Sequence, residues 1–128
     1  METNDEYIRI AKTKKIIDAR NVMLDDSYFN DISAKNVKII NANLSDLEIE
    51  GAQLGGAYIH NIGMPPKGHP FYDPAARQRP LKFEDCELSG SILTNCDLTG
   101  VSINDCDLTG TRINGILVEE LLKAYGKR

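Results

Sequence analysis

The sequence predicts an all-β solenoid in which a five-residue unit forms one side of each coil. Residues 86–110 divide into five successive pentads, each with a large aliphatic residue at its centre: CELSG, SILTN, CDLTG, VSIND and CDLTG. The same register covers residues 17–61 and 81–115, as nine pentads and then seven. A period of five suits neither an α-helix nor a strand, and short fixed repeats are typical of solenoids.

Each position in the pentad has its own residue type. The centre is mostly a large apolar residue, the residue two before it is small or apolar, and the last is Asn, Asp or Gly. These last three tolerate a left-handed backbone at a turn. We expect the centres to be buried, each contributing about 1.5–3 kcal/mol. Cys86, Cys96 and Cys106 occupy the small position, which predicts reduced thiols inside the solenoid.

The closing residues of the pentads indicate four sides per coil. When residues 62–80 are set aside and every fourth pentad is aligned, the closing residues form chemically uniform columns. One column is Asp throughout, at Asp26, Asp46, Asp85 and Asp105, and another joins Asn21, Asn41, Asn61 and Gly100. Four sides per coil would give about four coils, a rod of roughly 19 Å at the usual strand spacing.

In ANLSD, AQLGG and CDLTG the unit resembles the pentapeptide repeat family, whose consensus has Ala or Cys, then Asp or Asn, then Leu. The resemblance covers residues 17–115 apart from one insertion, and it implies a right-handed quadrilateral β-helix. It implies little about activity. Some members of the family bind DNA gyrase by imitating duplex DNA.

The ends of the repeats predict two caps. The expected domains are an N-terminal cap, the β-helix, its interrupting loop and a C-terminal helical cap, at residues 1–16, 17–116, 62–80 and 117–128. A solenoid end exposes core and strand edges that need a cover, although a disordered basic tail is an alternative for the N-terminal segment. The C-terminal segment has apolar residues at helical spacing, with Glu119 and Glu120 early and Lys123 late, as the helix dipole favours. In the resembled family such a helix also joins two rods, so it is a candidate homodimer surface.

The insertion at residues 62–80 reads IGMPPKGHPFYDPAARQRP and holds all five prolines of the chain. Because proline cannot lie inside a strand ladder, we expect an ordered excursion at a corner. Joining Asn61 to Leu81 should then leave an uninterrupted, stable solenoid. The insertion carries a net charge of +2, whereas residues 17–61 and 81–116 carry −4 each. Its candidate partner-binding residues are Lys67, His69, Phe71, Tyr72, Arg77 and Arg79.

An acidic flank along the Asp column is the second candidate partner-binding surface. It consists of Asp46, Glu48, Glu50, Asp85, Glu87, Asp105 and Asp107. The Asp column itself has three interpretations: carboxylates that accept hydrogen bonds from turn amides, an acidic strip for a partner, or a cation site. Ca²⁺ prefers six or more converging oxygens, more than a straight ladder supplies.

No pattern of residues predicts catalysis. His60 and His69 lack a patterned partner, and a nucleophile with an adjacent base is missing, so we expect no enzyme activity, no cofactor and no metal site. The net charge of −4 and the scattered basic residues disfavour direct nucleic-acid binding. A signal peptide and a membrane-spanning stretch are also missing, which predicts a cytoplasmic protein.

The sequence therefore predicts a non-catalytic protein-binding module. In this hypothesis a rigid repeat scaffold presents the Pro-rich loop and the acidic flank to an unidentified protein partner. The alternative follows from the family resemblance: a DNA-mimicking binder of DNA gyrase or topoisomerase, for which about four coils make a short rod.

Overall fold

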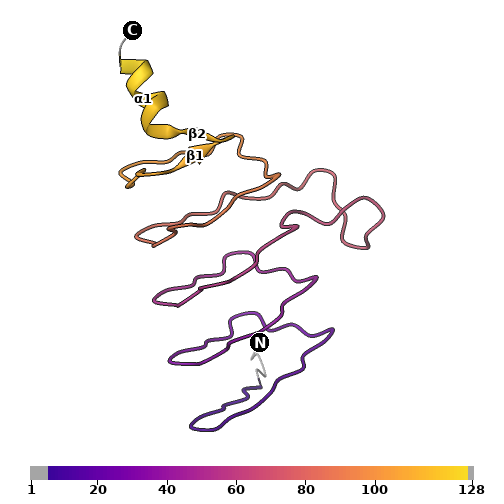
Figure 1. Ribbon diagram of the computed structural model, residues 1–128. Helices are drawn as coiled ribbons and strands as arrows, with labels where there is room; N and C mark the ends of the chain where they lie inside the picture. Colours follow the sequence, from indigo (N-terminus) through magenta and orange to yellow (C-terminus); the bar gives the residue numbers. More distant parts are fainter. Residues whose placement is uncertain (1–5, 127–128) are drawn as a thin grey trace. The chain divides into compact units, whose positions relative to one another are not determined.

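The computed structural model describes residues 6–126 and divides into two compact units, Met1–Tyr58 and Ile59–Arg128. In each unit the chain winds through successive turns (Figure 1). The regular elements of the described part all lie near its C-terminal end. They are β1 (Arg112–Ile113), β2 (Ile116–Leu117) and α1 (Val118–Gly126).

Left-handed backbone marks the end of every pentad. All closing residues from Asn21 to Asn61 and from Asp85 to Gly115 have a positive φ, between 52° and 80°. Asn and Asp adopt this conformation more readily than other residues with a side chain, and Gly adopts it without steric cost. The predicted five-residue register is therefore confirmed in the backbone of both blocks of repeats.

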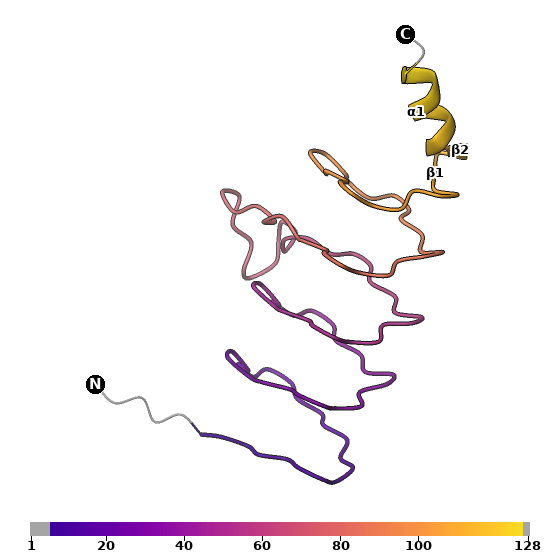
Figure 2. The ribbon, with the colours of Figure 1, turned by 90° about the vertical axis from the view of Figure 1, so that its left-hand side faces the viewer.

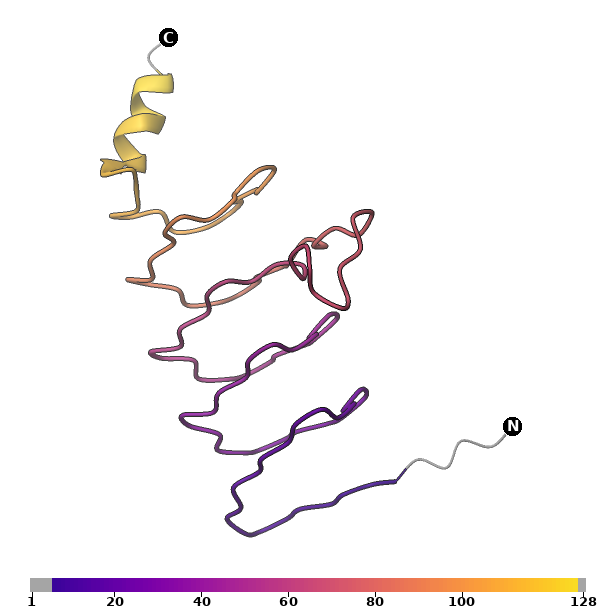
Figure 3. The ribbon, with the colours of Figure 1, turned by 90° about the vertical axis from the view of Figure 1, so that its right-hand side faces the viewer.

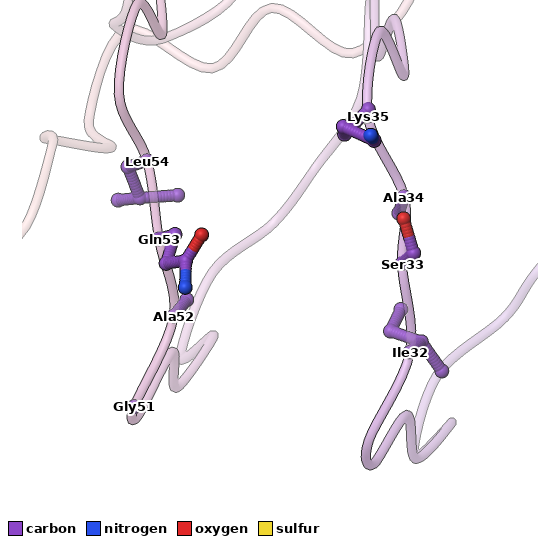
Figure 4. A pocket seen from close by; sticks show the side chains of 8 residues that line it. All are labelled: Ile32, Ser33, Ala34, Lys35, Gly51, Ala52, Gln53 and Leu54. Atoms are coloured by element: carbon purple, nitrogen blue, oxygen red, sulfur yellow. The ribbon is translucent and has the colours of Figure 1, made fainter.

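In the first unit, pentads that are twenty residues apart face each other. Residues 32–35 and 51–54 line one hollow of about 570 Å³ and run in the same direction (Figure 4). The winding path that brings them there can be followed from both sides of the ribbon (Figures 2 and 3). Twenty residues are four pentads, so this unit agrees with four sides per coil.

The pentad centres are exposed, which differs from the buried column that the sequence predicts. No residue among 6–126 is buried, and Leu98, the centre of a CDLTG unit, is 52% exposed. A pentad cannot bury its own centre or pair its own backbone, because both need contact with the next coil. Strands in the described part are limited to β1 and β2, so its secondary structure does not establish four coils.

The three cysteines are exposed as well, so the prediction that they lie inside is not met. Their thiols share one local geometry. Cys86 Sγ donates to Glu84 O, Cys96 Sγ to Thr94 O and Cys106 Sγ to Asn104 O, at 3.2–3.4 Å. Each thiol therefore points to the carbonyl oxygen of the residue two positions earlier, which places all three in the same position relative to the local backbone.

The last predicted pentad, residues 111–115, belongs to a β-hairpin. β1 pairs antiparallel with β2, and Ile113 lies opposite Ile116. Asn114 and Gly115 connect the strands with φ of 49° and 80°. Asn-Gly with two positive φ values is the preferred loop of a tight hairpin, because its twist matches that of the strands. The chain therefore reverses here, where the sequence analysis expected one more side of the coil.

Helix α1 follows β2 directly and is bonded to the last repeat. The Val118 N–H donates to Thr111 O at 2.9 Å, and the Gly110 N–H donates to Glu119 Oε1 at 2.8 Å. Glu119 and Glu120 lie in the first turn and Lys123 in the last, an arrangement that complements the helix dipole. The helix lies within the predicted segment 117–128.

The N-terminal segment has no regular structure where it is described. Residues 1–5 of the predicted cap lie outside the described part of the chain. Tyr7 and Ile8 are exposed, and the Arg9 guanidinium lies 5.1 Å from the centroid of the Tyr7 ring. At this distance the cation interacts favourably with the face of the ring.

Candidate functional site

The insertion at residues 62–80 is the candidate site, and three consecutive turns order its middle. Backbone hydrogen bonds close the turns, from His69 N to Pro66 O, Tyr72 N to His69 O and Ala76 N to Asp73 O, at 3.0–3.1 Å. Pro70 and Pro74 each occupy the second position of a turn, where the fixed φ of proline fits. The insertion departs from the winding path of the chain (Figure 3).

His69 organises the tip of the insertion. Its Nδ1 accepts a hydrogen bond from the Phe71 N–H at 3.1 Å, so this nitrogen carries no proton. The His69 and Phe71 rings lie with their centroids 5.7 Å apart and their planes tilted by 44°. His69 therefore fixes the position of Phe71 through a backbone hydrogen bond and a contact between the two rings.

Asp73 and Arg77 bond to the backbone of the third turn. Asp73 Oδ1 accepts a hydrogen bond from the Ala75 N–H at 3.0 Å. Arg77 Nη1 donates to Pro74 O and Ala76 O at 2.9 and 3.0 Å. These bonds fold the Arg77 side chain back over the turn, so part of its hydrogen-bonding capacity is already used within the insertion.

The insertion presents aromatic and basic side chains to solvent. Phe71 is 80% exposed and Tyr72 is 42% exposed. The other predicted loop residues are exposed too: Lys67, His69, Arg77 and Arg79. Large apolar side chains are exposed throughout the described residues, so Phe71 is distinguished by the hydrogen bond that fixes its backbone in the turn.

The predicted acidic flank is divided between the two units. Asp46, Glu48 and Glu50 belong to the first, and Asp85, Glu87, Asp105 and Asp107 belong to the second. All are exposed. The Asp column also combines two kinds of backbone geometry. Asp46 lies in a turn that is closed by a hydrogen bond from Leu47 N to Leu44 O, whereas Asp85 and Asp105 lie at bends without such a bond.

One set of side-chain hydrogen bonds in the turns was not expected from the sequence. In three pentads the second residue is Asn or Asp, and its side chain accepts a hydrogen bond from the backbone N–H of the fourth. The pairs are Asn43 with Ser45, Asp97 with Thr99 and Asp107 with Thr109, at 2.9–3.1 Å. Asn or Asp two residues before Ser or Thr is a known local signal for this bond, and ANLSD and CDLTG both contain it.

These bonds shift the acidity of two carboxyl groups. The hydroxyl and then the backbone N–H of Thr99 lower the pKa of Asp97 below its ordinary value. The same two groups of Thr109 lower the pKa of Asp107. Hydrogen bonds to a carboxylate stabilise its charged form. Asp107, predicted as a partner-binding residue, is thus also a structural acceptor.

The described residues contain neither a metal centre nor a membrane span. No three His, Cys, Asp or Glu side chains within residues 6–126 gather in a way that could hold a metal ion. No helix in that range is long and apolar enough to cross a bilayer. The hollow shown in Figure 4 is lined by Ser33, Lys35 and Gln53 together with apolar residues, a set without a paired acid and base.

Comparison with known proteins identifies the repeat. The family model described as pentapeptide repeats (8 copies) matches residues 82–115. Neither the curated proteins nor the solved structures gave a match. The match begins one residue into the pentad LKFED and ends at Gly115, the closing residue of TRING. Residues 82–115 therefore match pentapeptide repeats, which confirms the predicted resemblance for this segment of the chain.

Proposed function

We propose that this chain is a non-catalytic protein-binding module whose repeats carry the insertion at residues 62–80 as the recognition element. The observation that carries the proposal is the ordered backbone of the insertion, in which three consecutive hydrogen-bonded turns are joined by the bond from the Phe71 N–H to His69 Nδ1. A loop already fixed in its binding conformation loses less entropy on association. Aromatic side chains dominate binding hot spots.

Charge defines the kind of partner. The insertion carries +2, whereas the repeat segments on either side carry −4 each. A partner that docks on the insertion should therefore combine an acidic surface with an apolar recess for Phe71. Complementary charge would speed its association and orient it.

The proposal includes the finer features of the fold. We propose a right-handed quadrilateral β-helix of about four coils, supported by positive φ at every closing residue and by the facing segments 32–35 and 51–54. A cytoplasmic location and a homodimer through α1 are parts of the same hypothesis. The match of residues 82–115 to pentapeptide repeats supports the repeat scaffold in this hypothesis.

A second candidate is binding of DNA gyrase or topoisomerase by DNA mimicry. The acidity of the repeats favours it, since duplex DNA is a regular array of negative charge. In this case the partner would be basic and would contact Glu48, Glu50 and Glu87 instead of the insertion.

Affinity capture from the source cell tests the two candidates. The bait proteins are the wild type, the double variant Phe71→Ala/Tyr72→Ala, and Tyr28→Ala as a control, because Tyr28 is an exposed aromatic residue outside the insertion. We expect one protein to be held by the wild type and by Tyr28→Ala and lost from the double variant. Its direct binding is then measured with both purified components. Equal binding to all three baits would contradict the proposal, and topoisomerase subunits among the equally bound proteins would favour mimicry.

A further inference from the structure

Corners of two kinds alternate along the repeats. Every second corner is a turn whose third residue is the corner residue with a positive φ, and at six of these seven corners, all but Asn36, a hydrogen bond closes the four-residue turn. The closing bonds of 2.8–3.2 Å run from Ser27 to Leu24, Leu47 to Leu44, Ala57 to Leu54, Ser91 to Leu88, Val101 to Leu98 and Thr111 to Leu108. The corners between them are open bends, such as Asn41 and Asn95. A positive φ at the third residue alone is the pattern of a type II turn.

The two kinds of corner no longer alternate across residues 62–80 when these residues are left out of the count. Asn61 is an open bend, and so is Asp85, the next corner in a simple count of pentads. If Asn61 were joined directly to Leu81, two open bends would follow each other. The two blocks therefore differ in phase by one side of the coil.

A turn inside the insertion restores the alternation. Residues Pro66–His69 form a hydrogen-bonded turn whose third residue, Gly68, has a φ of 98°. This is the geometry of the closed corners in the repeats. The two later turns of the insertion differ, because their third residues, Phe71 and Ala75, are not among the residues with positive φ. With Gly68 counted as a corner, the order becomes Asn61 open, Gly68 closed, Asp85 open.

We infer that residues 62–68 are an additional side of the repeat scaffold, closed by Gly68, and that the recognition segment is residues 69–80 alone. This inference rests on the proposed function for its second half. It assigns Lys67 to the scaffold and keeps Phe71, Tyr72 and Arg77 in the recognition segment. It also replaces the sequence-based expectation that all of residues 62–80 can be removed without loss.

Two deletions test the register. Removing residues 69–80 joins Gly68 to Leu81 and keeps the corners alternating, whereas removing residues 62–80 places two open bends in succession. We expect the first variant to melt within about 4 °C of the wild type and the second to melt well below it or without a cooperative transition. A variant lacking residues 62–80 that melts as high as the one lacking residues 69–80 would overturn the inference.

Glycine substitutions give a second measurement that removes no residues. An added Cβ meets nothing within 4 Å at Gly63, Gly68 or Gly100, but only Gly68 and Gly100 have a positive φ. If Gly68 is a scaffold corner, Gly68→Ala lowers the melting temperature as Gly100→Ala does, because Ala is strained at positive φ. Gly63→Ala is the control that leaves it unchanged. A Gly68→Ala protein that melts like Gly63→Ala would show that this turn lies outside the cooperative scaffold.

Partner binding separates a failure of the register from a failure of the proposed function. The variant lacking residues 69–80 should keep its melting temperature and lose the protein that the wild type captures. If it keeps that protein while melting normally, residues 69–80 are not the recognition segment and both the proposed function and that assignment fail, whereas the corner at Gly68 stands. If Gly68→Ala melts like Gly63→Ala while the partner is still lost on deletion, the corner fails and the recognition segment stands.

Discussion

Asp107 Oδ1 accepts two hydrogen bonds from Thr109, one from the backbone N–H at 3.0 Å and one from the hydroxyl at 2.7 Å. Asn43 and Ser45 repeat the arrangement in the first block, at 3.1 and 2.6 Å. In both places Ser or Thr is the second residue of a closed turn. The side chain at the second position of the pentad thus fixes the entry to the turn, while the residue at the fifth position supplies the positive φ.

The first prediction concerns the acceptor at residue 107. Asp107→Ala removes both hydrogen bonds and should lower the melting temperature, because the Thr109 N–H loses its partner at the turn. Asp107→Asn keeps an acceptor oxygen, as Asn43 does, and should melt closer to the wild type. Thermal unfolding followed by circular dichroism measures the order of the three proteins. An Asn variant as unstable as the Ala variant would contradict this role.

The second prediction is an acid-sensitive component of stability. The folded protein lowers the pKa of Asp97 and of Asp107 from the ordinary value of 3.8. A carboxyl group whose pKa is lower in the folded state contributes stability above its unfolded pKa, and this contribution is lost as the pH falls through the folded pKa. The free energy of unfolding should therefore decline below about pH 4.

The matched variant is Asp97→Asn/Asp107→Asn, which keeps the acceptors and removes both titrations. Its free energy of unfolding should fall less between pH 5 and pH 2 than that of the wild type, when both are measured by urea titration across that pH range. Identical slopes for the two proteins would show that these carboxylates do not contribute to acid unfolding.

The third prediction concerns the left-handed corners. Asn95 has a φ of 56°, and a β-branched residue there would bring its Cβ close to the backbone. Asn95→Val should destabilise the protein by roughly 1–2 kcal/mol, and Asn95→Gly should be neutral or stabilising. Thr94→Val is the control, since it places the same side chain one residue earlier at a position without positive φ. Equal denaturant midpoints for the Val variants at residues 94 and 95 would argue against strain at the corner.

The fourth prediction concerns the bond between α1 and the last repeat. Glu119→Ala removes the acceptor of the Gly110 N–H and should cost about 0.5–1.5 kcal/mol. Glu120→Ala is the matched control, because it removes a carboxylate from the same helical turn. Hydrogen exchange should speed up at the Gly110 amide in the first variant only. Faster exchange in both variants would attribute the effect to the helix dipole instead of the direct bond.

The backbone of the repeats was predictable because it depends on local sequence. An Asn, Asp or Gly at every fifth residue determines where the chain turns, and each of these corners has the predicted positive φ. The hairpin at Asn114 and Gly115 was equally local, but the pentad pattern concealed its Asn-Gly signal. Burial of centres such as Leu98 depends on contacts between coils, and a repeat pattern specifies those contacts only indirectly.

In the candidate site, too, the features that depend on local sequence were predictable and those that depend on the conformation of a turn were not. The prolines and the change in charge located the insertion, and its exposed aromatic residues could be named from the sequence. The bond between His69 and the Phe71 N–H depends on the conformation of one turn, as does the fold of Arg77 over Pro74 and Ala76. Asp107 is the opposite case. Its pentad CDLTG contains the local sequence signal for a hydrogen bond from Asp107 to Thr109, but its charge led to the prediction that it binds a partner.

The last prediction separates the insertion from the acidic residues as the partner-binding surface. Reversing Glu48, Glu50 and Glu87 to Lys changes the charge of the repeats by six units while leaving the structural acceptor Asp107 in place. If the insertion binds an acidic partner, this triple variant should retain that partner and bind it at least as tightly, because negative charge on the protein that opposes association with an acidic partner is removed. Phe71→Ala/Tyr72→Ala should lose most of the affinity. Titration calorimetry with the purified partner measures both, with melting temperatures as a check on folding. A triple variant that loses the partner, together with a double variant that keeps it, would place the site on the acidic residues and favour the DNA-mimicking alternative.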